Sequence, residues 1–172
     1  MPSAIGAGWP LITCRRSLVA ALHGTDDRCM EQLFRRLLLA TDLSAASERA
    51  ANEAIRLAAE SGAPLLVLSV VDPGRLRLPG GLFLRRVDQE RARLETGARG
   101  LVARARAAGV RATFLVWEGD PAEAILAASE AEGVDLIVLG SHGRGPVGRF
   151  VLGSTSTSVS EQALCRVLVV AE

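Results

Sequence analysis

The sequence predicts an α/β fold with one open, mostly parallel sheet and helices on both of its faces. Short apolar runs alternate along the chain with segments of helical period, an alternation typical of linked strand–helix–strand units. The runs also lack polar alternation, as expected of strands that are covered on both faces. The length of 172 residues suits a single domain. No run reaches the ~18–20 apolar residues that a membrane-spanning helix needs.

The first 31 residues differ from the rest of the chain. They have no clear hydrophobic period and no acidic residue before Asp26. A basic pair and an apolar stretch within residues 15–22 weakly resemble a signal or transit segment, but the stretch is short and lies well in from the terminus. We therefore expect residues 1–31 to be a disordered leader or an over-extended start, with Met30 as the true first residue, in a cytoplasmic protein. The domain proper is expected over residues 32–172.

The first elements of this domain are two strands separated by a helix. The apolar run 37–40 predicts the first strand. The helical period that follows is capped by Ser44 or Ser47 and ends at Gly62. The continuous apolar run 65–71 predicts a second strand that is buried on both faces.

A long second helix is expected over residues 84–108. Gly97 and Gly100 lower its helix propensity, which permits a kink or a break there. Pro at the first position after Asp120 indicates the start of a third helix. The elements expected in the second half of the chain are a strand over 110–116, a helix from Asp120-Pro121 to Ala131, a strand over 134–139, a helix over 154–163 and a strand over 167–170.

Composition excludes several classes of chemistry and of partner. A formal net charge of +1 predicts no strong attraction to nucleic acid or to an anionic membrane. All 20 basic residues are Arg, so neither a Schiff-base lysine nor the lysine of a P-loop is available. Cys14, Cys29 and Cys165 are scattered, and His23 and His142 are the only histidines. This set fits neither a disulfide framework nor a metal site made of protein ligands.

The carboxyl ends of the predicted strands carry the candidate ligand residues. In a doubly wound sheet, ligands bind beyond these ends, at the point where the strand order reverses. Asp42 follows the first strand, Asp72 the second and Gly140 the fourth. Asp42 is therefore interpreted as a ligand contact, the alternative being a cap of the first helix.

Segment 140–155 is rich in glycine and leads into a predicted helix. Glycines let backbone N–H groups approach an anion closely. The helix that begins at Ser154 and Thr155 offers free N–H groups and the positive end of its dipole, and Arg144 and Arg149 carry positive charge. The segment therefore predicts phosphate binding. The alternative is a plain Gly/Ser connection between strand and helix.

Three other interpretations of this segment fail. The stretch Gly143–Gly148 matches G-x-G-x-x-G, but more loop follows, and no acidic residue ends a further strand as dinucleotide binding requires. Ser154 has neither a neighbouring histidine base nor a G-x-S-x-G elbow, so it is not expected to act as a nucleophile. His142 is interpreted as a solvent-facing loop residue in preference to a phosphate donor or general base.

Four motifs taken together resemble one protein family. The spacing Gly140-x2-Gly143-x9-Gly153-Ser154 matches the pattern G-x2-G-x9-G-[ST] of universal stress proteins. Three further segments are similar to the first, second and fourth strands of that family, in the same order, at residues 38–44, 67–72 and 134–140. Over residues 33–171, the chain resembles the ATP-binding members of the universal stress protein family, within the nucleotide α-hydrolase-like superfamily.

The resemblance implies a fold, a ligand and a set of contacts. The implied sheet has five parallel strands in the order 3-2-1-4-5, and the implied assembly is a homodimer formed through the last strand. The implied ligand is ATP or AMP, with Mg²⁺ or Mn²⁺ bound through the phosphates. The family often has Cys-Pro before its last strand, where this chain has Cys165-Arg166. The implied nucleotide-binding residues are Ala40, Asp42, Val70, Leu139, Gly140, Gly143, Gly153, Ser154 and Thr155.

From this resemblance we expect a nucleotide-binding module for stress response or signalling. Its ATP hydrolysis is expected to be slow or absent, because no residue near the loop is a convincing water-activating base. One alternative is a dimeric interaction subunit that binds no nucleotide. The other is an ATP-using enzyme of the same superfamily, although Thr41-Asp-Leu-Ser44 stands where such enzymes carry a Ser-Gly-Gly or His-x-x-His signature.

Overall fold

The fold is built on a parallel sheet of five strands flanked by helices, as the sequence predicts. The structure is a computed structural model that describes residues 12–13, 34–76, 82–141 and 153–171. Its parallel strands lie in the order β4-β3-β2-β5-β6, which is the expected order 3-2-1-4-5. The strands are β2 (Leu37–Ala40), β3 (Leu65–Val71), β4 (Ala112–Glu118), β5 (Leu136–Gly140) and β6 (Arg166–Val170).

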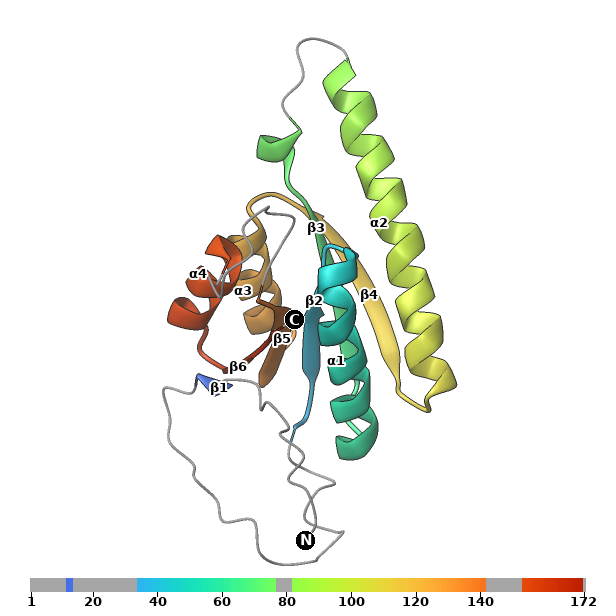
Figure 1. Ribbon diagram of the computed structural model, residues 1–172, viewed down its shortest axis with the longest axis vertical. Helices are drawn as coiled ribbons and strands as arrows, with labels where there is room; N and C mark the ends of the chain where they lie inside the picture. The colour runs from blue at the N-terminus through green and yellow to red at the C-terminus, as the bar shows by residue number, and fades with distance from the viewer. Residues whose placement is uncertain (1–11, 14–33, 77–81, 142–152, 172) are drawn as a thin grey trace, which may run out of the picture.

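Two helices cover each face of this sheet (Figure 1). Helices α1 (Glu48–Ser61) and α2 (Leu82–Ala107) lie on one face. Helices α3 (Pro121–Ala131) and α4 (Ser154–Gln162) lie on the other. Short 3-10 turns follow β2 and β3, at Ala45–Ser47 and Pro73–Arg75. None of the helices in the described ranges combines the length and the apolar character that a membrane span requires.

The packing of the core explains why the sequences of the strands are continuous apolar runs. Alternate side chains of one strand enter two different clusters: Leu37 and Leu39 face α1 and α2, whereas Leu38 faces α3 and α4. All three are fully buried, with 0% of their surface exposed. Because both faces of a central strand are covered, an apolar residue is favoured at every position rather than at every second one.

Two strands begin later than their apolar runs suggest. Strand β4 begins at Ala112 rather than at residue 110, because Gly109 ends α2 with a left-handed φ of 81° and the Val110 N–H still donates to Ala105 at 3.0 Å. Strand β5 begins at Leu136 rather than at residue 134. The Val134 N–H donates to Ser129 at 2.9 Å and so belongs to the end of α3.

Helix α2 runs without a break through both of its internal glycines. At Gly97 the absent side chain leaves room for a neighbour, since a Cβ built there would lie 2.3 Å from Cδ1 of Leu43. At Gly100 a Cβ would meet nothing within 4 Å. The helix therefore has no kink at Gly97, where the missing side chain instead makes room for Leu43.

A two-residue strand extends the sheet at the β6 edge. Strand β1 (Ile12–Thr13) pairs antiparallel with β6, placing Ile12 opposite Leu168 and Thr13 opposite Val167. These two residues belong to the segment expected to be a leader, and the rest of that segment lies outside the described residues.

The opposite edge of the sheet, β4, is lined by arginines of α2. Long charged side chains over an edge strand hinder its pairing with another chain. Each arginine contacts a different residue of the strand: Arg91 the Glu118 carboxylate at 2.9 Å, Arg99 the Phe114 ring at 5.9 Å from the centroid, and Arg106 the Ala112 carbonyl oxygen at 2.9 and 3.2 Å.

Candidate functional site

The candidate site lies where the carboxyl ends of β2, β3 and β5 meet. Ala40, the last residue of β2, is opposite Leu68 of β3 on one side and Leu139 of β5 on the other. The chain reverses the direction of winding between β2 and β5, since β3 and β4 lie on one side of β2 and β5 and β6 on the other. Ligands of doubly wound sheets bind at such a reversal.

Hydrogen bonds fix the first turn after β2. The Thr41 N–H donates to the Leu68 carbonyl oxygen at 3.0 Å, and the Thr41 carbonyl oxygen accepts from the buried Ser69 hydroxyl at 2.9 Å. The Thr41 hydroxyl accepts from the Leu43 N–H at 3.0 Å and lies 2.9 Å from the Ser47 hydroxyl. The chain that carries Asp42 is thus attached to both β3 and the start of α1.

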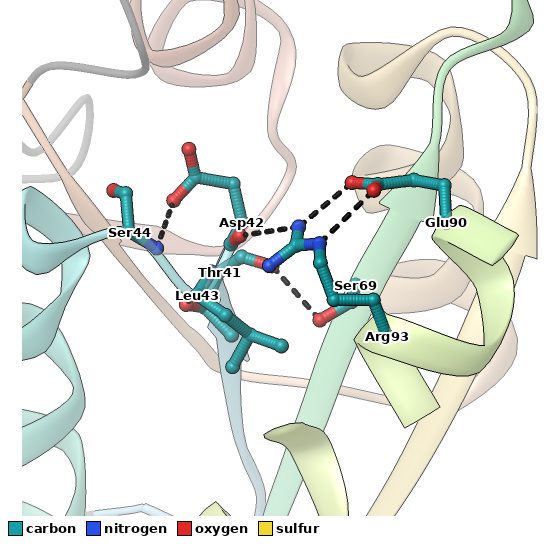
Figure 2. Close-up of polar contacts among 7 residues, drawn as sticks. All are labelled: Thr41, Asp42, Leu43, Ser44, Ser69, Glu90 and Arg93. Atoms are coloured by element: carbon teal, nitrogen blue, oxygen red, sulfur yellow. Dashed lines mark hydrogen bonds and ion pairs between the residues drawn. The ribbon is translucent and has the colours of Figure 1, made fainter. Parts of the chain in front are cut away.

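Asp42 itself forms a local turn and is also contacted from α2 (Figure 2). Its carboxylate accepts from the Ser44 N–H at 3.0 Å, and its carbonyl oxygen accepts from the Arg93 guanidinium at 3.3 Å. The same guanidinium donates to Glu90 at 2.7 and 3.0 Å. Glu90, and to a lesser extent Asp42, raise the pKa of Arg93, so this group stays charged.

Leu43 makes the second contact between this turn and α2. It is the only described residue other than glycine with a positive φ, 59°, a conformation that costs a side-chain-bearing residue about 1 kcal/mol. Its side chain packs against the α1–α2 core cluster and against a smaller cluster that contains Val71 and Leu94. This burial offsets the backbone strain.

The two ends of the glycine-rich segment are joined to each other. The Ser141 N–H donates to the Val170 carbonyl oxygen at 2.9 Å, and the Gly153 N–H donates to the Ser141 carbonyl oxygen at 2.9 Å. The Ser156 hydroxyl donates to the Gly153 carbonyl oxygen at 2.9 Å. Helix α4 therefore begins beside the end of β5. Its N-cap, Gly153, makes no side-chain capping bond to the first N–H groups, and such groups bind anions readily.

The structure gathers most of the predicted site residues at this edge. Ala40 is the last residue of β2 and Leu139 the last but one of β5, and the side chains of both are buried in the α3–α4 core cluster. Val70 lies two residues beyond Leu68 on β3, beside Trp117 of β4, and is partly buried. The remaining described members are Asp42 after β2, Gly140 at the end of β5, and Gly153, Ser154 and Thr155 at the start of α4.

Part of the predicted site falls outside the described residues. Gly143 is among the residues that the structure does not describe, together with His142, Arg144 and Arg149. Arg93, in contrast, is a described contact that sequence reasoning missed. Its bond to Asp42 joins residues 51 positions apart, a separation at which the sequence carries no periodic signal.

The described residues include no metal site made of protein ligands alone. Within those parts of the chain, no group of three or more His, Cys, Asp or Glu side chains could hold a metal ion. Cys165 lies just before β6, at the amino end of that strand, and burial raises the pKa of its thiol. The thiol is therefore a poorer ligand and nucleophile at neutral pH than an exposed one.

Comparison with known proteins gives consistent similarities. The sequence model of the family described as "Universal stress protein family" matches residues 33–171. A protein of Thermus aquaticus, "Universal stress protein in QAH/OAS sulfhydrylase 3'region", is 39% identical over 139 residues, which are 80% of this chain and 99% of that protein.

Solved structures show the same similarity. Universal stress protein UspA from Lactobacillus plantarum has a TM-score of 0.72 and 28% identity, over 78% of this chain and 96% of that one. A universal stress protein in complex with cAMP has a TM-score of 0.62 and 26% identity, over 80% of this chain and 97% of that one.

Proposed function

Because the chain belongs to the universal stress protein family, we propose that it binds an adenine nucleotide, ATP or AMP, at the carboxyl edge of its sheet. The observation that carries this proposal is the joining of β5 to α4: the Gly153 N–H bonds to Ser141, so the uncapped start of α4 lies beside the strand end. A helix start in this position suits phosphate groups. A structural relative that binds cAMP supports the same class of ligand.

The proposed contacts divide between nucleoside and phosphates. Asp42 and the backbone of Val70 lie at the ends of β2 and β3 and suit the nucleoside, while Ser154 and Thr155 at the start of α4 suit the phosphates. Mg²⁺ or Mn²⁺ would bind through those phosphates. Mg²⁺ usually keeps several waters and takes few protein ligands, so a site of this kind needs no cluster of protein ligands.

We further propose that the protein acts in the cytoplasm as a module for stress response or signalling. It is expected to hydrolyse ATP slowly or not at all. Two carboxylates near the strand ends are already used as turn acceptors. Asp42 accepts from the Ser44 N–H at 3.0 Å and Asp72 from the Gly74 N–H at 2.9 Å. Neither is placed as a free general base. Rapid phosphate release from ATP by the purified protein with Mg²⁺ would contradict this part of the proposal.

The nucleotide proposal is tested first on the protein purified without added ligand. Mass spectrometry of the small molecules released on denaturation is expected to find an adenine nucleotide. Isothermal titration with ATP and Mg²⁺ is then expected to give saturable binding. Loss of both hydroxyls in the double variant S154A/T155A should weaken binding about tenfold or more, because hydrogen bonds to charged phosphates are stronger than neutral ones.

Ser158→Ala is the matched control, since it removes a serine hydroxyl from the same helix, further from its start. It should bind ATP as the unaltered protein does. If the double variant and the control bound equally well, Ser154 and Thr155 would not hold the phosphates. If the folded protein neither carried nor bound nucleotide, the interaction-subunit alternative would replace this proposal.

A further inference from the structure

A second concave site lies at the opposite end of the sheet. It is an open groove of about 660 Å³ at the amino ends of β3 and β4, a volume within the range of small-molecule sites. Its floor is formed by residues 64–66 and 109–113, and the residue before β2 and the end of α3 complete its walls. Since β3 has seven residues, this groove lies roughly 20 Å from the carboxyl edge.

The charge of the groove is mainly positive. Three arginines line it, Arg36, Arg106 and Arg111, against one acidic residue, Glu132. Guanidinium groups are suited to planar, two-point recognition of carboxylates and phosphates. The groove therefore favours anions.

Two of the three arginines are already oriented. Arg36 pairs with Glu132, and Arg106 donates from Nε and Nη2 to the Ala112 carbonyl oxygen at 3.2 and 2.9 Å. Each side chain is thus held by a neighbour, which lowers the entropy lost when a ligand binds.

The third arginine has no such neighbour. Within the described residues, no hydrogen bond or ion pair is found for the side chain of Arg111 or for the hydroxyl of Thr113, and both residues are exposed on the groove. Together they offer donor groups beside the two oriented arginines.

We propose that this groove is a second ligand site, which binds a small organic molecule carrying two or more adjacent anionic groups, phosphate or carboxylate. Arg111 and Thr113 supply the donors, and Arg36 and Arg106 supply the surrounding positive charge. The site uses none of the residues assigned to the nucleotide. Its ligand therefore binds whether or not ATP occupies the carboxyl edge.

The test is an NMR titration of the ¹⁵N-labelled full chain with inorganic pyrophosphate and, separately, with citrate, both without nucleotide or Mg²⁺, because ATP itself carries adjacent phosphates and Mg²⁺ binds both anions. The amides of Gly109, Val110 and Thr113 are expected to shift and to saturate. Saturation with pyrophosphate alone would identify a phosphate site, and saturation with citrate alone a carboxylate site.

Arg111→Gln is expected to weaken this binding about tenfold, because it removes a charged two-point donor. Arg85→Gln removes the same charge from an exposed residue near the start of α2, the end opposite to Arg106. This variant should leave anion binding in the groove unchanged. The proposal is overturned if neither anion shifts these amides at millimolar concentration, or if both variants bind as the unaltered protein does. Failure of ATP to bind would not affect this result.

Discussion

At the scale of single residues, the turn after β2 depends on the contact between Leu43 and Gly97. Leu43 adopts a left-handed backbone, and its Cδ1 occupies the space that a side chain at residue 97 would need. Arg93, one turn earlier on α2, bonds to the neighbouring Asp42 carbonyl oxygen. The two contacts hold the Asp42 turn against a helix that is distant in sequence.

Gly97→Ala and Gly100→Ala are therefore expected to have opposite effects on stability. A Cβ at residue 97 would lie 2.3 Å from Leu43, so G97A should lower the free energy of unfolding by about 1–3 kcal/mol, as overpacking does. G100A meets no atom within 4 Å and should raise it by about 0.5–1 kcal/mol through helix propensity. Urea unfolding measures both.

The same pair of variants tests the link between this contact and ligand binding. Movement of Leu43 displaces Asp42, so G97A should also weaken ATP binding, whereas G100A should not. Equal stability of the two variants would show that the turn relaxes around the new methyl group without cost.

Residues of this kind mark the limit of what the sequence predicts about the site. Asp42, Gly140 and Ser154 follow strand ends or begin a helix, positions that a hydrophobic pattern reveals. The roles of Arg93 and Leu43 depend on how α2 crosses the sheet, which is a tertiary property. A glycine in a helix indicates low helix propensity. The sequence does not indicate which neighbouring side chain fills the space that the missing glycine side chain leaves.

At the scale of elements, α3 shows how local sequence sets a helix start. The Asp120 carboxylate accepts from the Ala122 N–H at 2.8 Å and from the Glu123 N–H at 3.1 Å, and Pro121 occupies the first helical position. Both start signals, the capping carboxylate and the proline, are local in the sequence. The helix therefore begins where the sequence predicts.

Asp120→Ala is expected to lower the free energy of unfolding by about 1 kcal/mol, the usual cost of losing an N-cap. Asp120→Asn should leave stability nearly unchanged, because its side-chain oxygen can accept the same two hydrogen bonds. Thermal or urea unfolding distinguishes the two variants. If D120N were as unstable as D120A, the carboxylate charge at the helix dipole, rather than the cap geometry, would be the stabilising feature.

Element boundaries were less predictable than the elements themselves. Asp135, the residue just before β5, shows why. Its carboxylate accepts from the backbone N–H groups of Arg35 at 2.9 Å and of Arg36 at 3.2 Å. Asp135 thereby ties the approach to β2 to the approach to β5, and the sheet begins at the next residue, Leu136. An apolar run cannot reveal this long-range partner.

At the scale of the whole molecule, the pattern of buried runs predicted the fold class, whereas the strand order came from the family resemblance. Periodicity alone does not distinguish one order of parallel strands from another. Strand β1 was not predicted at all, because its two β-branched residues form too short a run to indicate a strand, and the β6 edge supplies their pairing partner.

The family resemblance implies a homodimer formed through that same edge, so we expect β1 and a second molecule to compete for it. The chain without residues 1–31 should fold, because the expected domain begins at residue 32, and it should show a larger dimer fraction by light scattering than the full chain at equal concentration. An unpaired edge strand is a template for pairing.

Replacing both Ile12 and Thr13 with proline gives the matched control, because proline removes their backbone N–H groups without shortening the chain. This variant should dimerise as the truncated chain does. If the full chain, the truncated chain and the proline variant had the same mass, β1 would not compete for the β6 edge.

The arginines of α2 that line β4 determine how far such an assembly can grow. If the protein pairs through β6, the contacts of Arg91, Arg99 and Arg106 with β4 hinder strand addition at the other edge, and each molecule then has only one adhesive edge, a valence of one. Units of valence one form closed pairs and cannot polymerise, unlike those with two adhesive edges. We therefore expect this protein to form closed pairs, and not filaments, even at high concentration.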